Sequence, residues 1–65
     1  MLVEKVGRRE WKGLKINEIG MFTLPTETAA EVGRVALSQV KKLYGMDFER
    51  IPTKEPRTLV YRRIK

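Results

Sequence analysis

Basic and aromatic side chains alternate near the end of the chain, where residues 57–65 read RTLVYRRIK. In a strand, such side chains could place guanidinium groups on phosphates while a tyrosine ring stacks on a base. The same pattern is also typical of a solvated strand edge that discourages aggregation, with the tyrosine in the core. The first interpretation makes this segment a candidate phosphate-binding site, whose members are Arg57, Tyr61, Arg62, Arg63 and Lys65.

A second basic cluster surrounds Trp11 and contains Arg8, Arg9, Lys12 and Lys15. A lone tryptophan in a small domain usually packs in the core or in a dimer contact. An exposed one would instead be a stacking platform or an interface hot spot. We therefore expect Arg8, Arg9 and Lys12 to contact phosphates, and Trp11 to lie in a core or an interface.

The chain of 65 residues has a formal net charge of +6, and the excess lies near its two ends. Residues 4–15 sum to +3, residues 16–49 to −2 and residues 50–65 to +5. If the terminal segments meet in the fold, both basic regions would lie on one surface and form a binding site for a polyanion. This convergence is the premise on which a nucleic-acid function depends.

Residue patterns for catalysis or metal binding are missing from the sequence. Cysteine and histidine are absent, which removes disulfides, thiolate and imidazole metal ligands and the usual neutral-pH general base. Among the eight acidic residues, Glu27 with Glu31 suits a helix start, and Asp47 with Glu49 suits the exposed face of a strand. We therefore expect no enzyme, no cofactor and no metal site.

No apolar run approaches the roughly 18 residues that a membrane-spanning helix needs. The opening stretch MLVEKVGRRE carries charges where a signal peptide has its apolar core. A chain without cysteine also fits a reducing compartment. These features predict a cytoplasmic protein without a membrane partner.

Residues 24–45, LPTETAAEVGRVALSQVKKLYG, carry strong signals for one helix at both ends. Pro25 and the pair Thr28 and Glu31 predict its start, with Thr26 as the competing cap. Gly45 predicts its end, because glycine accepts the left-handed conformation of a helix terminus. One arc of the helix is apolar and is predicted to be buried; it contains Ala29, Val32, Gly33, Ala36, Leu37, Val40, Leu43 and Tyr44.

The opposite side of this helix carries Arg34, Ser38 and Lys41. A helix in a major groove could use such residues, whereas a solvated face with a local Glu31–Arg34 pair is the simpler interpretation. Val35 is the one apolar residue on that side, and it would be a natural contact in a homodimer.

Strand patterns lie on both sides of the helix. Residues 21–24 lead directly into it, residues 46–51 alternate in polarity, and residues 57–65 are rich in β-branched and aromatic side chains. The proline-containing stretch 52–56 predicts a loop between two antiparallel strands. Residues 1–13 are expected to form a turn, mobile ends and at most an extra edge strand. The sequence predicts one α+β domain over residues 1–65, with a sheet of three or four strands in the order β(β)-α-β-β and the helix packed on one face.

Residues 14–64 resemble a group of very small phage and prophage proteins with a strand, a proline, a helix and two closing strands. The resemblance rests on residues 14–25, LKINEIGMFTLP, on residues 45–48, and on the closing VYRRI of residues 60–64. In that group the first strand opens with VGD and the last reads RVWRI, where this chain has residues 16–18, INE, and Tyr61. The resemblance implies a mobile-element setting and no particular site residues.

Two functions follow from these features. The first is a basic protein that binds DNA or RNA through phosphate contacts from its terminal segments. The second is an interaction module or inhibitor that binds a host protein and works as a homodimer, because a sheet with one helix layer leaves its other face uncovered. That face distinguishes the two: an apolar patch of Trp11, Phe22, Leu59 and Tyr61 would favour a protein partner, and lysines and arginines would favour nucleic acid.

Overall fold

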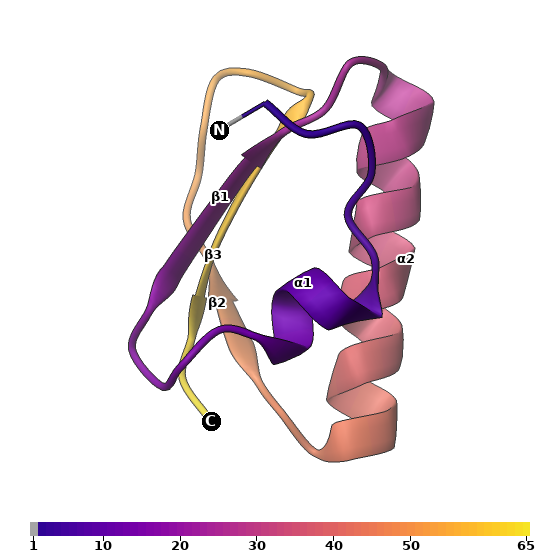
Figure 1. Ribbon diagram of the computed structural model, residues 1–65. Coiled ribbons are helices and arrows are strands. Elements are labelled where there is room, and N and C mark those ends of the chain that lie inside the picture. Colours follow the sequence, from indigo (N-terminus) through magenta and orange to yellow (C-terminus); the bar gives the residue numbers. More distant parts are fainter. Residues whose placement is uncertain (1) are drawn as a thin grey trace.

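The computed structural model describes residues 2–65 and contains two helices and three strands. In chain order these are α1 (Arg8–Lys12), β1 (Ile19–Thr23), α2 (Glu27–Tyr44), β2 (Phe48–Arg50) and β3 (Thr58–Arg63). The strands form one antiparallel sheet in the order β1-β3-β2, and both helices lie on the same side of it (Figure 1). The predicted α+β fold with one main helix over a small antiparallel sheet is confirmed.

The main helix α2 begins at a different hydroxyl from the one that the capping-box spacing favoured. Thr26 is the N-cap, and its Oγ1 accepts a hydrogen bond from the backbone N–H of Ala29 at 3.1 Å. Thr28 is the second residue of the helix, within its first turn, and is not the N-cap, which corrects that expectation. The predicted end is confirmed, because Gly45 has φ 66° in the left-handed region.

The buried stripe of α2 is narrower than the apolar arc of its sequence. Ala30, Gly33, Ala36, Leu37 and Val40 are buried, whereas the predicted core positions Val32, Leu43 and Tyr44 are exposed. A helix of 18 residues is about 27 Å long and the longest strand, of six residues, about 20 Å. The last turn of α2 therefore extends past the sheet that it covers.

The N-terminal segment forms a short helix instead of the predicted turn or edge strand. Helix α1 begins after Gly7, whose N–H donates to Glu10 Oε1 at 2.6 Å. Of the preceding residues, Leu2 forms a single parallel bridge with Thr23, and Val3 donates a hydrogen bond to the same residue. Residue 1 lies outside the described residues. Five helical residues give too little periodicity to identify from sequence.

Trp11 joins α1, α2 and the sheet. Its side chain is 0 % exposed, and its indole N–H donates to the carbonyl of Gly33 in α2 at 2.9 Å. Its ring packs edge-on against Phe22, Phe48 and Tyr61, one from each strand, with centroids 5.2, 6.0 and 5.4 Å away. Such contacts add to the burial of apolar area, so Trp11 is the central residue of the core.

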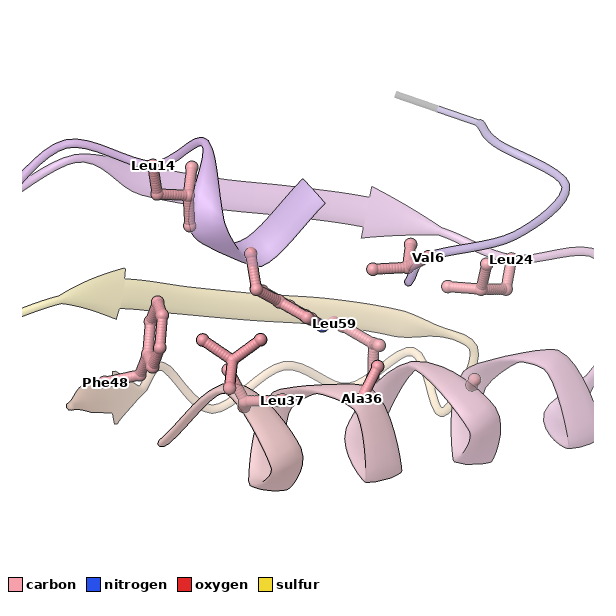
Figure 2. Packing of buried hydrophobic residues seen from close by; sticks show 10 residues of the cluster. Val6, Leu14, Leu24, Ala36, Leu37, Phe48 and Leu59 are labelled. Carbon is pink, nitrogen blue, oxygen red and sulfur yellow. The ribbon is translucent and has the colours of Figure 1, made fainter. Parts of the chain in front are cut away.

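The rest of the core fills the space between α2 and the sheet (Figure 2). Leu37 from α2, Phe48 from β2 and Leu59 from β3 point into this layer, with Val6 and Leu24 at its end. A Cβ added to Gly33 would lie 2.7 Å from Leu59 Cδ1, so a glycine there lets α2 approach β3 closely. The layer packs α2 mainly against the central strand β3, and helix α1 packs against α2 beside it.

The strands agree with the predicted segments except at their ends. β2 and β3 form the expected antiparallel hairpin, with Glu49 opposite Arg62. β3 also pairs with β1, where Met21 lies opposite Val60. β3 is thus the central strand, and β1 and β2 are the two edges.

Candidate nucleic-acid interface

One end of the molecule collects basic residues from three separate segments of the chain. These segments are α1 with the turn after it (residues 8–18), the last turn of α2 with the loop that follows (41–47), and residues 63–65 (Figure 1). Arg63 Nη1 donates to the carbonyl of Leu14 at 2.8 Å, and the N–H of Asp47 donates to the carbonyl of Lys65 at 3.1 Å. We call this region the cationic end; its basic residues are Arg8, Arg9, Lys12, Lys15, Lys41, Lys42, Arg63 and Lys65.

The cationic end holds nearly all of the net charge. Residues 8–18 contain four basic and two acidic residues. Residues 41–47 contain two basic residues and one acidic residue, and residues 63–65 contain two basic residues and no acidic one. These segments sum to +5, against +6 for the whole chain. The other 40 or so residues are thus close to neutral, and the field of the protein is concentrated at one end.

The acidic residues of the cationic end are engaged in local contacts. Glu10 accepts from the N–H of Gly7, and Glu18 accepts from the N–H of Lys15 at 2.7 Å. Asp47 accepts from the N–H of Phe48 at 2.9 Å and lies 3.6 Å from Lys41 Nζ. Only Lys41 of the eight basic side chains forms an ion pair with an acidic side chain within residues 2–65.

A shallow depression at this end is lined by Arg8, Arg9, Lys12, Gly13 and Tyr44. Trp11 faces the core, so the neighbouring basic residues of α1 point outward around this depression. The ammonium of Lys12 lies 4.4 Å from the centre of the Tyr44 ring, which is a cation–π contact. Tyr44 is 49 % exposed, so an aromatic ring lies among three cations at the surface.

Five of the eight residues predicted to bind phosphates lie at the cationic end. Arg8, Arg9 and Lys12 come from one basic segment, and Arg63 and Lys65 come from the other. The two segments meet because Arg63 spans to the carbonyl of Leu14, directly after α1 and the turn residue Gly13. The convergence expected for the two ends of the chain therefore occurs for these five.

The other three predicted residues lie elsewhere, which corrects the expectation of one continuous strand surface. Arg62 projects from the opposite face of the sheet, and its Nη2 donates to Glu49 Oε1 at 2.8 Å. Arg57 follows the loop after β2, where it bonds the carbonyl of Pro25 and pairs with Glu55 at 3.5 Å. Tyr61 is half-buried against Trp11. Strand alternation separates these neighbours, since consecutive side chains point to opposite faces.

Trp11 and Val35, the two residues predicted to lie in an interface, differ in exposure: the first is buried and the second is exposed. Trp11 is a core residue and offers no surface to a partner, so only the core interpretation of this tryptophan agrees with the structure. Val35 is 56 % exposed on the outer side of α2, as expected.

Sequence reasoning missed Tyr44 as a surface residue of the site. Its position in the apolar arc predicted burial, and its overhang beyond the sheet was not visible in the sequence. Lys41 and Lys42 lie in the last turn of α2, where their charge suits the negative end of the helix dipole. Their closeness to residues 63–65 depends on the hydrogen bonds between Asp47 and the end of the chain.

A second group of cations lines a cleft of about 290 Å³ between α2 and the loop that joins β2 to β3. Arg34, Arg50 and Lys54 lie along it, together with Tyr61 and Glu55. These three cations form no ion pair within the part of the chain that the structure describes. They are a matched set against which the cationic end can be tested.

The sheet face turned away from the helices is uncovered among residues 2–65 (Figure 1). Alternation places on it Ile19, Met21, Thr23, Glu49, Ile51, Thr58, Val60 and Arg62. Neither expected composition is found there. Trp11, Phe22, Leu59 and Tyr61 lie on the helix side, and the uncovered face is an apolar surface around the single pair Arg62–Glu49.

Among residues 2–65, no helix is both long and apolar enough to cross a membrane. Comparison of the chain with protein-family models, with curated proteins and with solved structures finds no match. The resemblance of residues 14–64 to small phage proteins therefore stays a prediction.

Proposed function

We propose that this protein binds nucleic acid through the cationic end, mainly by contacts to phosphates. The observation that carries the proposal is the concentration of +5 of the +6 net charge in three segments that meet at one end of the fold. A polyanion gains from such a field because each neutralised phosphate releases condensed counterions. The proposal is a binding function without catalysis, in the cytoplasm; its mobile-element setting draws on the resemblance alone.

The depression at α1 favours a nucleic-acid ligand that is single-stranded or has an unpaired region. Arg8, Arg9 and Lys12 could hold the backbone, and the exposed Tyr44 ring offers a stacking surface for a base. Stacking is tolerant of sequence because every base has an aromatic face. The outer side of α2 carries Arg34, Ser38 and Lys41, which a helix in a major groove could use, but the acidic Glu31 is exposed on the same helix. We therefore expect weak sequence preference and leave DNA and RNA as alternatives.

The test is the salt dependence of binding to labelled oligonucleotides, single-stranded and duplex, DNA and RNA, measured by fluorescence anisotropy. The variant Arg8→Gln, Arg9→Gln, Lys12→Gln removes three charges from the depression. If each residue contacts one phosphate, the slope of log K against log salt should fall by about two to three.

The matched control is Arg34→Gln, Arg50→Gln, Lys54→Gln, which removes the same charge from the cleft beside the β2–β3 loop. It should leave the slope close to that of the unchanged protein. Equal slopes for both variants would mean that only total charge matters, and a larger loss in the control would place binding at the cleft. Either result would contradict a site at the cationic end.

The uncovered sheet face supports the second candidate, a contact with a host protein. Ile19 and Met21 lie two residues apart in β1, so they share one face of the sheet, and they are 56 % and 54 % exposed. Met21 lies opposite Val60 of the central strand. Purification from cells with and without nuclease separates the candidates. An absorbance excess removed by nuclease favours nucleic acid, whereas a stoichiometric protein that stays bound, and is lost with Met21→Lys, favours the host protein.

A further inference from the structure

We propose that the uncovered sheet face is a self-complementary interface, and that its occupant is a second copy of this chain. The face carries apolar side chains, a cation and a carboxylate, and its net charge is zero. Nucleic-acid binding at the cationic end does not depend on this contact, because the two surfaces are on different parts of the molecule.

The apolar part of the face runs across all three strands. Ile19 and Met21 come from β1, Val60 from the central strand β3, and Ile51 directly follows β2, where its N–H donates to the carbonyl of Val60 at 2.9 Å. Thr23 and Thr58 bond each other through their hydroxyls at 3.1 Å, so their polar groups are satisfied within the face. Burying this surface against a similar one would remove exposed apolar area from water.

The charges select a second copy over other occupants. A two-fold contact brings the same patch of both copies together, so residue i meets residue j and j meets i. Arg62 and Glu49 lie side by side on neighbouring strands, with an Nη2–Oε1 distance of 2.8 Å. A two-fold axis close to this pair would place Arg62 of each copy near Glu49 of the other. For a polyanion, by contrast, the face offers one cation that is already neutralised.

The hydrogen bonding of Arg62 is incomplete within one copy. Glu49 takes one corner of the guanidinium, and Nε of Arg62 is covered and has no acceptor within residues 2–65. An arginine fork can bind a carboxylate through two parallel hydrogen bonds. A carboxylate from a second copy would give the fork a second acceptor after a modest turn of the side chain.

The size of the face predicts a weak dimer. Three strands about 4.8 Å apart and about 20 Å long give a footprint of a few hundred Å², below the roughly 800 Å² per partner of a standard stable interface. We therefore expect dissociation constants in the micromolar range or above. Sedimentation equilibrium over protein concentrations up to about 1 mM covers this range.

The decisive experiment uses two single charge reversals. Arg62→Glu leaves two carboxylates on the face and Glu49→Arg leaves two cations, so each variant alone should repel its own copy and dimerise at least about 10-fold more weakly. An equal mixture of the two should recover association as a heterodimer, because the acidic face then meets the basic one. Far-UV circular dichroism of each variant checks that the fold is retained.

The matched control reverses the other exposed arginine–glutamate pair, Arg57→Glu and Glu55→Arg, which lies away from this face. Each control variant should dimerise like the unchanged protein, and mixing them should add nothing. A second variant, Met21→Lys, tests the apolar part and should weaken association without charge reversal. A chain that stays monomeric to the highest concentration, or a mixture that fails to recover association, would overturn the proposal.

Discussion

The two sides of the sheet of this small domain differ in how they use the same residue types. On the helix side, aromatic residues surround Trp11, and eight basic residues gather at the cationic end, around α1 and the last turn of α2. On the uncovered side, aliphatic residues are exposed and the one basic residue is paired with a carboxylate. The helix side therefore combines a closed core with a free cationic surface, and the other side combines an open apolar surface with neutralised charge.

Arg62 and Arg63 show this difference within two consecutive residues. Arg63 faces the helix side, where it donates to the carbonyls of Leu14 and Lys65. Arg62 faces the uncovered side and is held by Glu49. In the sequence the two arginines are neighbours in one basic segment, and nothing local distinguishes them. In the structure only Arg63 belongs to the cationic end. The face that a charged strand residue occupies thus decides to which surface of the molecule it contributes.

The largest expected effect is the loss of stability when Trp11, the central core residue of the helix side, is truncated. Trp11→Ala removes three ring contacts and the hydrogen bond to Gly33, and should cost about 3–5 kcal/mol in the free energy of unfolding. A 65-residue domain has little more than that to lose. Urea denaturation followed by far-UV circular dichroism measures it.

Val35→Ala is the control for the tryptophan variant, because Val35 is exposed on α2 and should change the free energy of unfolding by less than about 0.5 kcal/mol. A Trp11→Ala protein that unfolds at the same urea concentration as the unchanged chain would contradict the central position of Trp11.

A smaller effect sharpens the comparison of the two arginines. Arg63→Gln should lower the free energy of unfolding by about 1–2 kcal/mol, because the carbonyl of Leu14 loses a charged donor. It should also reduce the salt slope of nucleic-acid binding by about one. Arg62→Gln removes the same charge, but should cost less than about 1 kcal/mol, since its ion pair is exposed, and should leave the slope unchanged. Anisotropy titrations of both variants compare the slopes directly. Equal changes in slope would show that the sheet face on which the arginine lies does not affect nucleic-acid binding.

The smallest loss of stability is expected at the start of α2, at Thr26, which belongs neither to the cationic end nor to the uncovered sheet face. Thr26→Ala removes the cap to the N–H of Ala29 and should cost about 1 kcal/mol. Thr28→Ala should change stability by only a few tenths of a kcal/mol. Neither variant should alter the salt slope or the dimerisation, which separates loss of stability from loss of binding. Thermal unfolding measures the difference, and the reverse order would identify Thr28 as the cap.

The elements with strong local signals could be predicted from the sequence alone. The end of α2 at Gly45, the hairpin of β2 and β3 and the α+β class follow from glycine conformation, proline punctuation and polarity patterns. The basic character of both ends of the chain is likewise a property of composition. These features depend on residues close together in the sequence, so no partner element is needed to predict them.

The tertiary structure alone decided where those features lie in space. Helix α1 is too short to be stable by itself and depends on burial of Trp11 between α2 and the sheet. The assignment of Arg62 and Arg63 to opposite faces depends on the register of β3 between its two neighbours. The exposure of Tyr44 depends on a helix longer than the sheet beneath it. Each of these is set by contacts between segments far apart in the chain, and such contacts leave no local pattern in the residues that make them.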